Sequence, residues 1–194
     1  MTTERDKWNQ RYEAGSHSSM TPDPFLVRAW ESFISPLFPT GGRALDVAGG
    51  IGRHAIFLAK RNWHVTMIDI SEEGIAQARR NAGKLEAQID FHIVDMKVAS
   101  SREELGHEKY DLVLVFYYLD REIFPALLQT LAPHGLLIYK AYTVDQIKFG
   151  DGPSHPMHLL KENELLHSFQ QLRILHYKET IHDRGVAELV GRKH

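Results

Sequence analysis

The stretch from Ala44 to Ala59, ALDVAGGIGRHAIFLA, constrains the fold more than any other part of the chain. It joins an apolar segment, Arg43 to Ala48, to an amphipathic segment through a turn with glycine at positions 49, 50 and 52. The apolar segment is typical of a buried strand, and the pattern after the turn predicts a helix from about Gly52 to Arg61. Glycines between a buried strand and a helix allow the backbone to approach a ligand closely.

The rest of the chain continues this alternation. Strands are predicted over residues 64–70, 89–95, 110–118 and 135–143, and helices over residues 71–82 and 120–131. Near the C-terminus, LRILHYKETI and VAELVGRK are joined by the turn HDRG and can form only an antiparallel hairpin. We therefore expect an α/β fold with a doubly wound, mostly parallel, seven-stranded Rossmann-like sheet and an antiparallel C-terminal hairpin.

Composition excludes several classes of function. The 194 residues include no cysteine, which rules out disulfides, thiolate metal sites and cysteine nucleophiles. The formal net charge is −2, so neither nucleic acid nor an anionic membrane is an expected partner. No apolar stretch approaches the roughly 18 residues of a membrane span, and the N-terminus lacks a secretory signal pattern. The expected location is cytoplasmic.

Residues with a binding role should lie at the carboxyl ends of the strands, because ligands of open α/β sheets bind there. Asp46, Asp69, Asp95 and the segment from Phe116 all follow or end predicted strands. The glycine turn and the later acid fit two classes of ligand. Gly50 with Asp69, 19 residues further on, is also compatible with a nicotinamide dinucleotide.

Three observations favour S-adenosylmethionine over the dinucleotide. Asp46 lies four residues before Gly50, where a carboxylate would repel a pyrophosphate but attract an ammonium or sulfonium group. Asp95 can accept a hydrogen bond from the adenine amino group while its neighbour Met96 packs on the ring. The terminal hairpin leaves little room for the separate substrate domain of many dehydrogenases.

The motifs ALDVAGGIGRHAIFLA, VTMIDIS and IVDM resemble those of the class I S-adenosylmethionine-dependent methyltransferases over residues 40–145. Ala48 replaces the first glycine of the usual signature, a change that we expect to be sterically mild, and Gly49 stands where a cysteine often occurs. The resemblance implies a set of cofactor contacts between Asp46 and Phe116: Asp46, Ala48, Gly49, Gly50, Gly52, Arg53, Asp69, Ile70, Asp95, Met96 and Phe116. Arg53 is either a surface cation or a contact to the carboxylate of the cofactor.

A narrower resemblance covers nearly the whole chain. WNQRYEAG, PDPFL, FYYLDREIFPALLQTLAPHGLLIYKAYT and GPSHPMHLLKENELLHSF are similar to segments of the small tellurite-resistance and thiopurine-type methyltransferases. In that group an N-terminal aromatic segment folds over the cofactor, and the substrates are small molecules or oxyanions. By this resemblance, Trp8 and Tyr12 would help to close the site.

We interpret the chain as a single methyltransferase domain. Residues 1–40 are expected to form an N-terminal helical cap, 41–143 the cofactor-binding core, 144–160 a substrate loop, and 161–194 a C-terminal helix and hairpin. Long irregular segments such as residues 144–160 are usually functional. Tyr117, Tyr142 and His155 are the candidate residues of the acceptor pocket, and the histidine spacing favours no metal site.

The sequence thus predicts a methyltransferase, monomeric or homodimeric, acting on a small thiol, chalcogen oxyanion or amine. Methyl transfer from a sulfonium needs mainly alignment of the reacting atoms, and no residue stands out as a general base. Two alternatives stay open: an NAD(P)-binding reductase and a catalytically silent nucleoside-binding or scaffold protein. RNA methylation is disfavoured by the near-zero net charge.

Overall fold

The computed structural model describes residues 3–194, and the chain divides into two compact units, Met1–Ser101 and Arg102–His194. The first unit holds the predicted cap and the glycine turn, and the second holds the predicted substrate loop and C-terminal hairpin. No helix in the described residues is both long and apolar enough to span a membrane.

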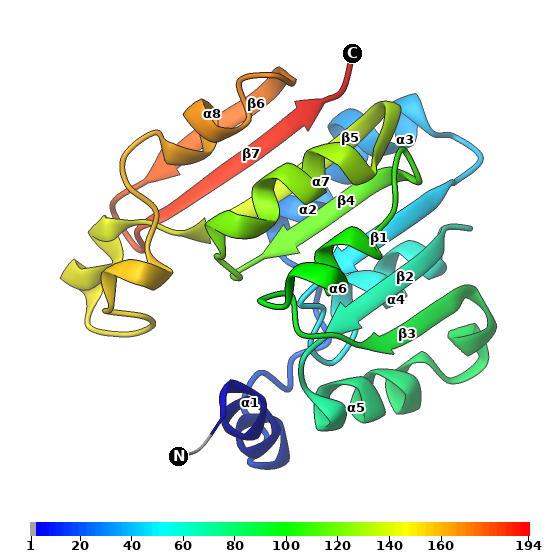
Figure 1. Ribbon diagram of the computed structural model, residues 1–194, viewed down its shortest axis with the longest axis horizontal. Helices are drawn as coiled ribbons and strands as arrows, with labels where there is room; N and C mark the ends of the chain where they lie inside the picture. Colours follow the sequence, from blue (N-terminus) through cyan, green and yellow to red (C-terminus); the bar gives the residue numbers. More distant parts are fainter. Residues whose placement is uncertain (1–2) are drawn as a thin grey trace. The chain divides into compact units, whose positions relative to one another are not determined.

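The first unit is built on three parallel strands in the order β3-β2-β1. Their bounds are β1 Arg43–Val47, β2 His64–Asp69 and β3 Ile89–Ile93. Helix α4 (Arg53–Ala59) follows β1, and α5 (Glu72–Ala82) with a short 3₁₀ turn (Gly83–Gln88) follows β2, as Figure 1 shows. Each strand therefore ends where a helix or turn begins, as the alternation predicts.

The N-terminal segment of the first unit is mainly helical. It contains α1 (Glu4–Glu13), α2 (Pro24–Ala29), a π-helical stretch (Trp30–Ile34) and α3 (Ser35–Leu37). The side chain of Thr3 caps α1 and that of Asp23 caps α2, so each helix starts at a residue suited to that position. Only Tyr12 of α1 is buried, whereas α2 buries three residues.

The second unit is a four-stranded mixed sheet in the order β4-β5-β7-β6. The strands are β4 Tyr110–Phe116, β5 Leu131–Tyr142, β6 Arg173–Thr180 and β7 Val186–Arg192. β4 and β5 are parallel, whereas β7 is antiparallel to both β5 and β6. The predicted C-terminal hairpin is therefore confirmed.

Aromatic residues join the helices of the second unit to its sheet. The ring of Phe124, at the start of α7 (Phe124–Thr130), lies 5.9 Å from that of Tyr139 in β5 and 5.0 Å from that of Phe169. Phe169 ends α8 (Glu164–Ser168), and all three side chains are buried. A short α6 (Ala99–Glu103), which the sequence analysis did not predict, precedes this unit's first strand.

The helix that follows β4 and the strand after that helix have different bounds from those predicted. A 3₁₀ turn (Arg121–Ile123), capped by Asp120 as its pattern indicates, leads into α7, and β5 already begins at Leu131 rather than at Gly135. The pairing of β5 with β4 shifts between Leu131 and Leu136, so the expected turn is present as an irregularity inside the strand. His134 lies there with a positive φ of 64°.

The segment 144–160 contains two 3₁₀ helices, Val144–Phe149 and Pro156–His158, and two side chains fix it. Gln146 is 1% exposed; its amide nitrogen donates to the Asp151 carbonyl, and its amide oxygen accepts from the Gly185 N–H. Arg121 donates to the carbonyls of Met157 and Leu159 and pairs with Glu164. The long loop is thus tied to the hairpin turn and to α8.

Replacing Gln146 by leucine should loosen this segment. The variant leaves the buried Gly185 N–H without its acceptor, which costs about 1–3 kcal/mol in the free energy of unfolding. Urea unfolding should show that loss, and trypsin should cleave after Lys148 faster than in the wild-type protein. The exposed Gln170→Leu variant is the control, and equal cleavage of both variants would contradict the role of Gln146.

Candidate functional site

The glycine turn after β1 has an unusual backbone. Ala48, Gly50 and Gly52 all have positive φ, at 55°, 59° and 85°. The Gly49 N–H donates to the carbonyl of Ile68 in β2, and the Gly52 N–H donates to the Gly49 carbonyl. Positions 50 and 52 are glycine because a positive φ strains any other residue. Ala48 is strained by about 1–2 kcal/mol, so its replacement of glycine is less mild than the sequence analysis expects.

Asp69, at the end of β2, binds the glycine turn directly. Its carboxylate accepts one hydrogen bond from the Gly50 N–H and another from the Ser71 N–H, each at 2.8 Å. The side chain is 5% exposed, and this burial raises the pKa of the Asp69 carboxyl, although hydrogen bonds from the backbone at residues 71, 50 and 70 oppose the shift. One buried carboxylate therefore holds together the two loops that follow β1 and β2.

Asp46 is the second buried acid beside the turn. It is 1% exposed, and its Oδ2 atom has no hydrogen-bond partner within residues 3–194. A side chain at position 49 would place its Cβ 3.0 Å from that oxygen and 2.7 Å from the Met67 side chain, so only glycine fits beside the buried carboxylate. Burial raises the pKa of Asp46 to about 7, while the positive charge of Arg53 acts against the shift. A hydrogen-bond donor, above all a cationic one, would offset the cost of burying this oxygen.

Arg53 begins α4, where a cation is unfavourable unless an anion lies nearby. Its charge lowers the pKa of Asp46, which shows that the buried acid already supplies a compensating charge. The position of Arg53 therefore does not by itself require a ligand carboxylate.

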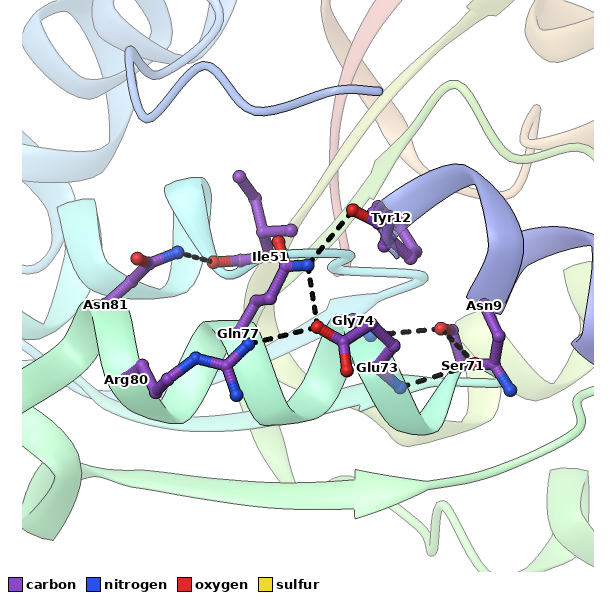
Figure 2. Close-up of polar contacts among 9 residues, drawn as sticks. All are labelled: Asn9, Tyr12, Ile51, Ser71, Glu73, Gly74, Gln77, Arg80 and Asn81. Carbon is purple, nitrogen blue, oxygen red and sulfur yellow. Dashed lines mark hydrogen bonds and ion pairs between the residues drawn. The ribbon is translucent and has the colours of Figure 1, made fainter. Parts of the chain in front are cut away.

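Helix α1 is docked on the first turn of α5 by hydrogen bonds (Figure 2). The Asn9 side-chain oxygen accepts from the Ser71 hydroxyl at 2.6 Å and from the Glu73 N–H at 3.3 Å. The Gln77 side chain donates to the Tyr12 carbonyl at 3.1 Å. Ser71 also caps α5 by accepting from the Gly74 N–H, so the same hydroxyl serves both helices.

Tyr12 brings an aromatic ring onto the glycine turn. A Cβ at Gly50 would lie 2.7 Å from the Tyr12 hydroxyl, and a Cβ at Gly74 would lie 2.9 Å from its ring. Burial and the nearby charge of Asp69 raise the pKa of the Tyr12 hydroxyl. Trp8 stacks on Tyr12 with the ring centroids 5.8 Å apart. The structure therefore brings both predicted cap residues together, with Tyr12 against the glycine turn.

The remaining predicted contacts in the first unit follow the strand ends. Asp95 is half-buried beyond β3, and its carboxylate accepts from the Lys97 N–H at 2.9 Å. Met96 is 5% exposed, and the backbone of Ile70 hydrogen-bonds to the Asp69 carboxylate. The Val94 N–H donates to the Asp69 carbonyl, so the ends of β2 and β3 are joined.

The second unit contains the other candidate residues. Phe116 ends β4 and is buried, and Tyr117 follows it with a positive φ of 58°. The rings of Tyr117 and Tyr142 lie 5.0 Å apart, so the structure brings these two candidates together. His155 is exposed; its Nδ1 accepts from the Met157 N–H, and its ring lies 6.1 Å from that of His158. The structure thus shows His155 in contacts within its own loop.

The sequence analysis missed several residues that build the cap. Asn9 and Gln77 hold α1, and Gly74 makes room for the Tyr12 ring. His17 packs edge-on against Trp8 and Tyr12, and burial lowers its pKa. These side chains act across separate helices and match no local pattern. The clearest available signal was Gly74, a glycine inside an otherwise regular helical pattern.

The residues at the turn fit a nucleoside ligand that carries a positive charge. The orphaned Asp46 oxygen would accept a hydrogen bond from an ammonium group, whereas a pyrophosphate beside it would be repelled. Asp69 offers a second carboxylate at the position where sugar hydroxyl groups bind in related folds. A Cβ at Gly49 would crowd the Asp46 carboxylate, and a Cβ at Gly50 would meet the Tyr12 hydroxyl, so the turn beside Asp46 accepts only glycine at these positions.

Comparison with known proteins agrees with this reading. A family model described as a methyltransferase domain matches residues 44–135. A relative from Geobacillus sp. (strain WCH70), described as a methyltransferase, is 31% identical over 136 residues, which cover 61% of this chain and 53% of that protein. TehB of Haemophilus influenzae, described as an S-adenosyl-L-methionine-dependent methyltransferase, is 26% identical over 72% of this chain and 49% of its own length. The chain thus spans about half the length of these relatives.

Solved structures show the fold. The crystal structure of TehB from Haemophilus influenzae matches 96% of this chain and 67% of that one, with a TM-score of 0.72 and 20% identity. A Burkholderia thailandensis 1,6-didemethyltoxoflavin-N1-methyltransferase matches 97% of this chain and 86% of that one, with a TM-score of 0.71 and 15% identity. The predicted fold class, a seven-stranded Rossmann-like methyltransferase fold with an antiparallel C-terminal end, is confirmed.

Residues 44–135 thus match a methyltransferase domain, and the fold is that of solved methyltransferases, among them an N-methyltransferase from Bradyrhizobium japonicum in complex with S-adenosyl-l-homocysteine. The chain is similar to TehB of Haemophilus influenzae in both sequence and structure.

Ala48→Gly should stabilise the protein. Glycine relieves the left-handed strain at this position, and the gain exceeds the entropy that glycine adds to the unfolded chain, so the free energy of unfolding should rise by about 0.5–1 kcal/mol. Urea unfolding measures this change in the free energy of unfolding. Ala76→Gly in α5 is the control and should lower the free energy of unfolding by about 1 kcal/mol, because that position is helical. Equal losses in both variants would refute the strain at Ala48.

Asp46→Asn should stabilise the protein while weakening the binding of S-adenosylhomocysteine, the product of the cofactor. Burial raises the pKa of Asp46 to about 7, so the folded protein binds this proton more tightly than the unfolded chain does. The stability that the bound proton provides is fully present below the unfolded pKa of 3.8 and is lost as the pH rises through 7. The variant should therefore exceed the wild type in unfolding free energy at pH 8 by about 1–2 kcal/mol and match it more closely at pH 5. Thermal unfolding at both pH values tests this, and a less stable variant at pH 8 would contradict it.

Proposed function

We propose that the protein transfers the methyl group of S-adenosylmethionine to a small-molecule acceptor in the cytoplasm, as a monomer or homodimer. The observation that carries this proposal is the buried Asp46 carboxylate, which has an orphaned oxygen beside the glycine turn. That arrangement favours a ligand with a positive charge, which the amino acid part of S-adenosylmethionine provides. It disfavours the pyrophosphate of a nicotinamide dinucleotide.

The residues of the turn divide the binding of the cofactor between them. Asp46 would accept from its ammonium group, and Asp69 would accept from the ribose hydroxyls with the lone pairs that its three backbone hydrogen bonds leave free. Asp95 and Met96, just after β3, are the candidates for the adenine. Tyr12 and Trp8 would exclude water from the bound cofactor. When bound, the cofactor supplies an activated methyl group on a good leaving group.

A small-molecule acceptor is supported by charge and by similarity. The net charge of −2 gives no electrostatic attraction for RNA or DNA. The matched methyltransferase from Burkholderia thailandensis has a small heterocycle, 1,6-didemethyltoxoflavin, bound in its structure. Tyr117 and Tyr142 are our candidate acceptor contacts, since their phenol groups can donate to a heteroatom while their rings pack on it. A thiol, a chalcogen oxyanion or an amine is the acceptor class to test.

The test is isothermal titration with S-adenosylhomocysteine, with NADH as the competing ligand. Wild-type protein should bind the first and not the second. Asp69→Asn should weaken binding by about 2 kcal/mol or more, because it removes a charge that binds both the turn and the ribose. Asp90→Asn is the matched control: it removes an exposed carboxylate, paired with His64, from the same unit and should leave the affinity unchanged.

Binding of NADH alone would refute the methyltransferase proposal. If S-adenosylhomocysteine binds, labelled S-adenosylmethionine is offered with a thiol, selenite, tellurite and an amine, and methylated product is sought. Methylation of an RNA oligonucleotide instead of these acceptors would overturn the small-molecule part of the proposal. Circular dichroism of Asp69→Asn confirms that a loss of affinity is not a loss of fold.

A further inference from the structure

A cavity lies in the second unit, at the opposite end of its strands from Tyr117 and Tyr142. It has a volume of about 210 Å³ and is lined by His134, Arg173, Arg192, Lys193 and His194. All five are basic residue types. The register places Leu136 of β5 beside Arg192, six residues from Tyr142, which corresponds to about 20 Å along a strand. This cavity is therefore separate from the candidate acceptor residues.

The cavity is built by strand pairing and not by flexible tails alone. Arg173, the first residue of β6, is the direct register partner of Arg192, the last residue of β7. Directly opposed residues of antiparallel strands project from the same face with their Cβ atoms about 5 Å apart. Two guanidinium groups are thus held next to each other by the backbone.

Like charges at such a pair are destabilising unless a counter-charge lies between them. Among residues 3–194, neither Arg173 nor Arg192 has a carboxylate within ion-pair distance. Glu108 pairs with Lys193 at 3.3 Å. The positive charge of the two arginines is therefore left uncompensated, in a protein whose net charge is −2.

The hydrogen bonds around the cavity leave donors available to a ligand. Arg192 Nε donates to the His134 carbonyl at 3.2 Å, which orients its guanidinium group and leaves the two terminal nitrogens for other acceptors. Lys193 is committed to structure, because it donates to the carbonyls of Leu131 and Leu128. The irregular part of β5, where His134 has its positive φ, forms the wall of the cavity.

We propose that this cavity binds a phosphate group of a small anion, such as free pyrophosphate or a nucleoside monophosphate. Paired guanidinium groups match the tetrahedral oxygens of phosphate better than they match a monovalent ion. The volume is below that of pockets for drug-sized ligands, about 300–1,000 Å³, which suits a compact anion. The site is distinct from the cofactor site and does not depend on the proposed methyl transfer.

The test is isothermal titration of the whole protein at low ionic strength with pyrophosphate, with adenosine monophosphate and with sulfate. Pyrophosphate should bind and should shift the ring signals of His134 in NMR spectra. Adenosine monophosphate separates the two sources of the phosphate group: tighter binding than pyrophosphate assigns a nucleotide, and weaker binding assigns the free anion. Arg173→Gln should weaken pyrophosphate binding at least about tenfold, since it removes a charged donor.

Arg184→Gln is the matched control. Arg184 lies in the turn at the other end of the β6–β7 hairpin, so this change removes the same charge from the same unit without touching the cavity. Its effect should stay below about twofold, as expected for screened charges at that distance. The proposal is wrong if wild-type protein binds no pyrophosphate at millimolar concentration, or if both variants weaken binding equally. Tighter binding of a short RNA than of either small anion would also overturn it.

Discussion

The hydrogen bonds from the backbone to the Asp69 carboxylate are the interaction on which the first unit depends. One carboxylate joins the Gly50 N–H after β1 to the Ser71 N–H after β2, and Ser71 in turn caps α5 and donates to Asn9 of α1. The glycine turn, the start of α5 and the N-terminal cap therefore share a single polar framework. A rigid backbone at this point lets a ligand bind without first ordering the loops.

The two buried acids of the turn have different electrostatic consequences. Asp69 is satisfied by backbone donors, whereas Asp46 keeps an oxygen without a partner. Burying an unpaired carboxylate opposes folding, and natural proteins retain such groups mainly at functional sites. The unpaired oxygen of Asp46 therefore has two effects: it lowers the stability of the protein without a ligand, and it favours the binding of a cationic ligand.

Local chemistry allowed much of this fold to be predicted. The glycine turn and the terminal hairpin each follow from a few adjacent residues, and the structure contains both. The start of β5 was predicted four residues late. Its irregular pairing with β4 is set by the neighbouring strand and not by the residues PHG at positions 133–135. The docking of α1 and the role of Gln146 join residues far apart in sequence, so no local pattern reveals them. The roles of the candidate site residues stay predictions.

The fit of Tyr12 against two glycines has a consequence for how the sequence can vary among related chains. The phenol group occupies the space that a side chain at residue 50 or 74 would need. A smaller residue at position 12 would remove the closest contact that keeps residue 74 a glycine and leave the Gly50 carbonyl at 3.3 Å, and alanine is the better helix former there. Chains that have lost this tyrosine are therefore less constrained at position 74, while Gly50, with its positive φ, is kept by the backbone in either case. Covariation between positions 12 and 74, without position 50, is the evolutionary trace that this contact should leave.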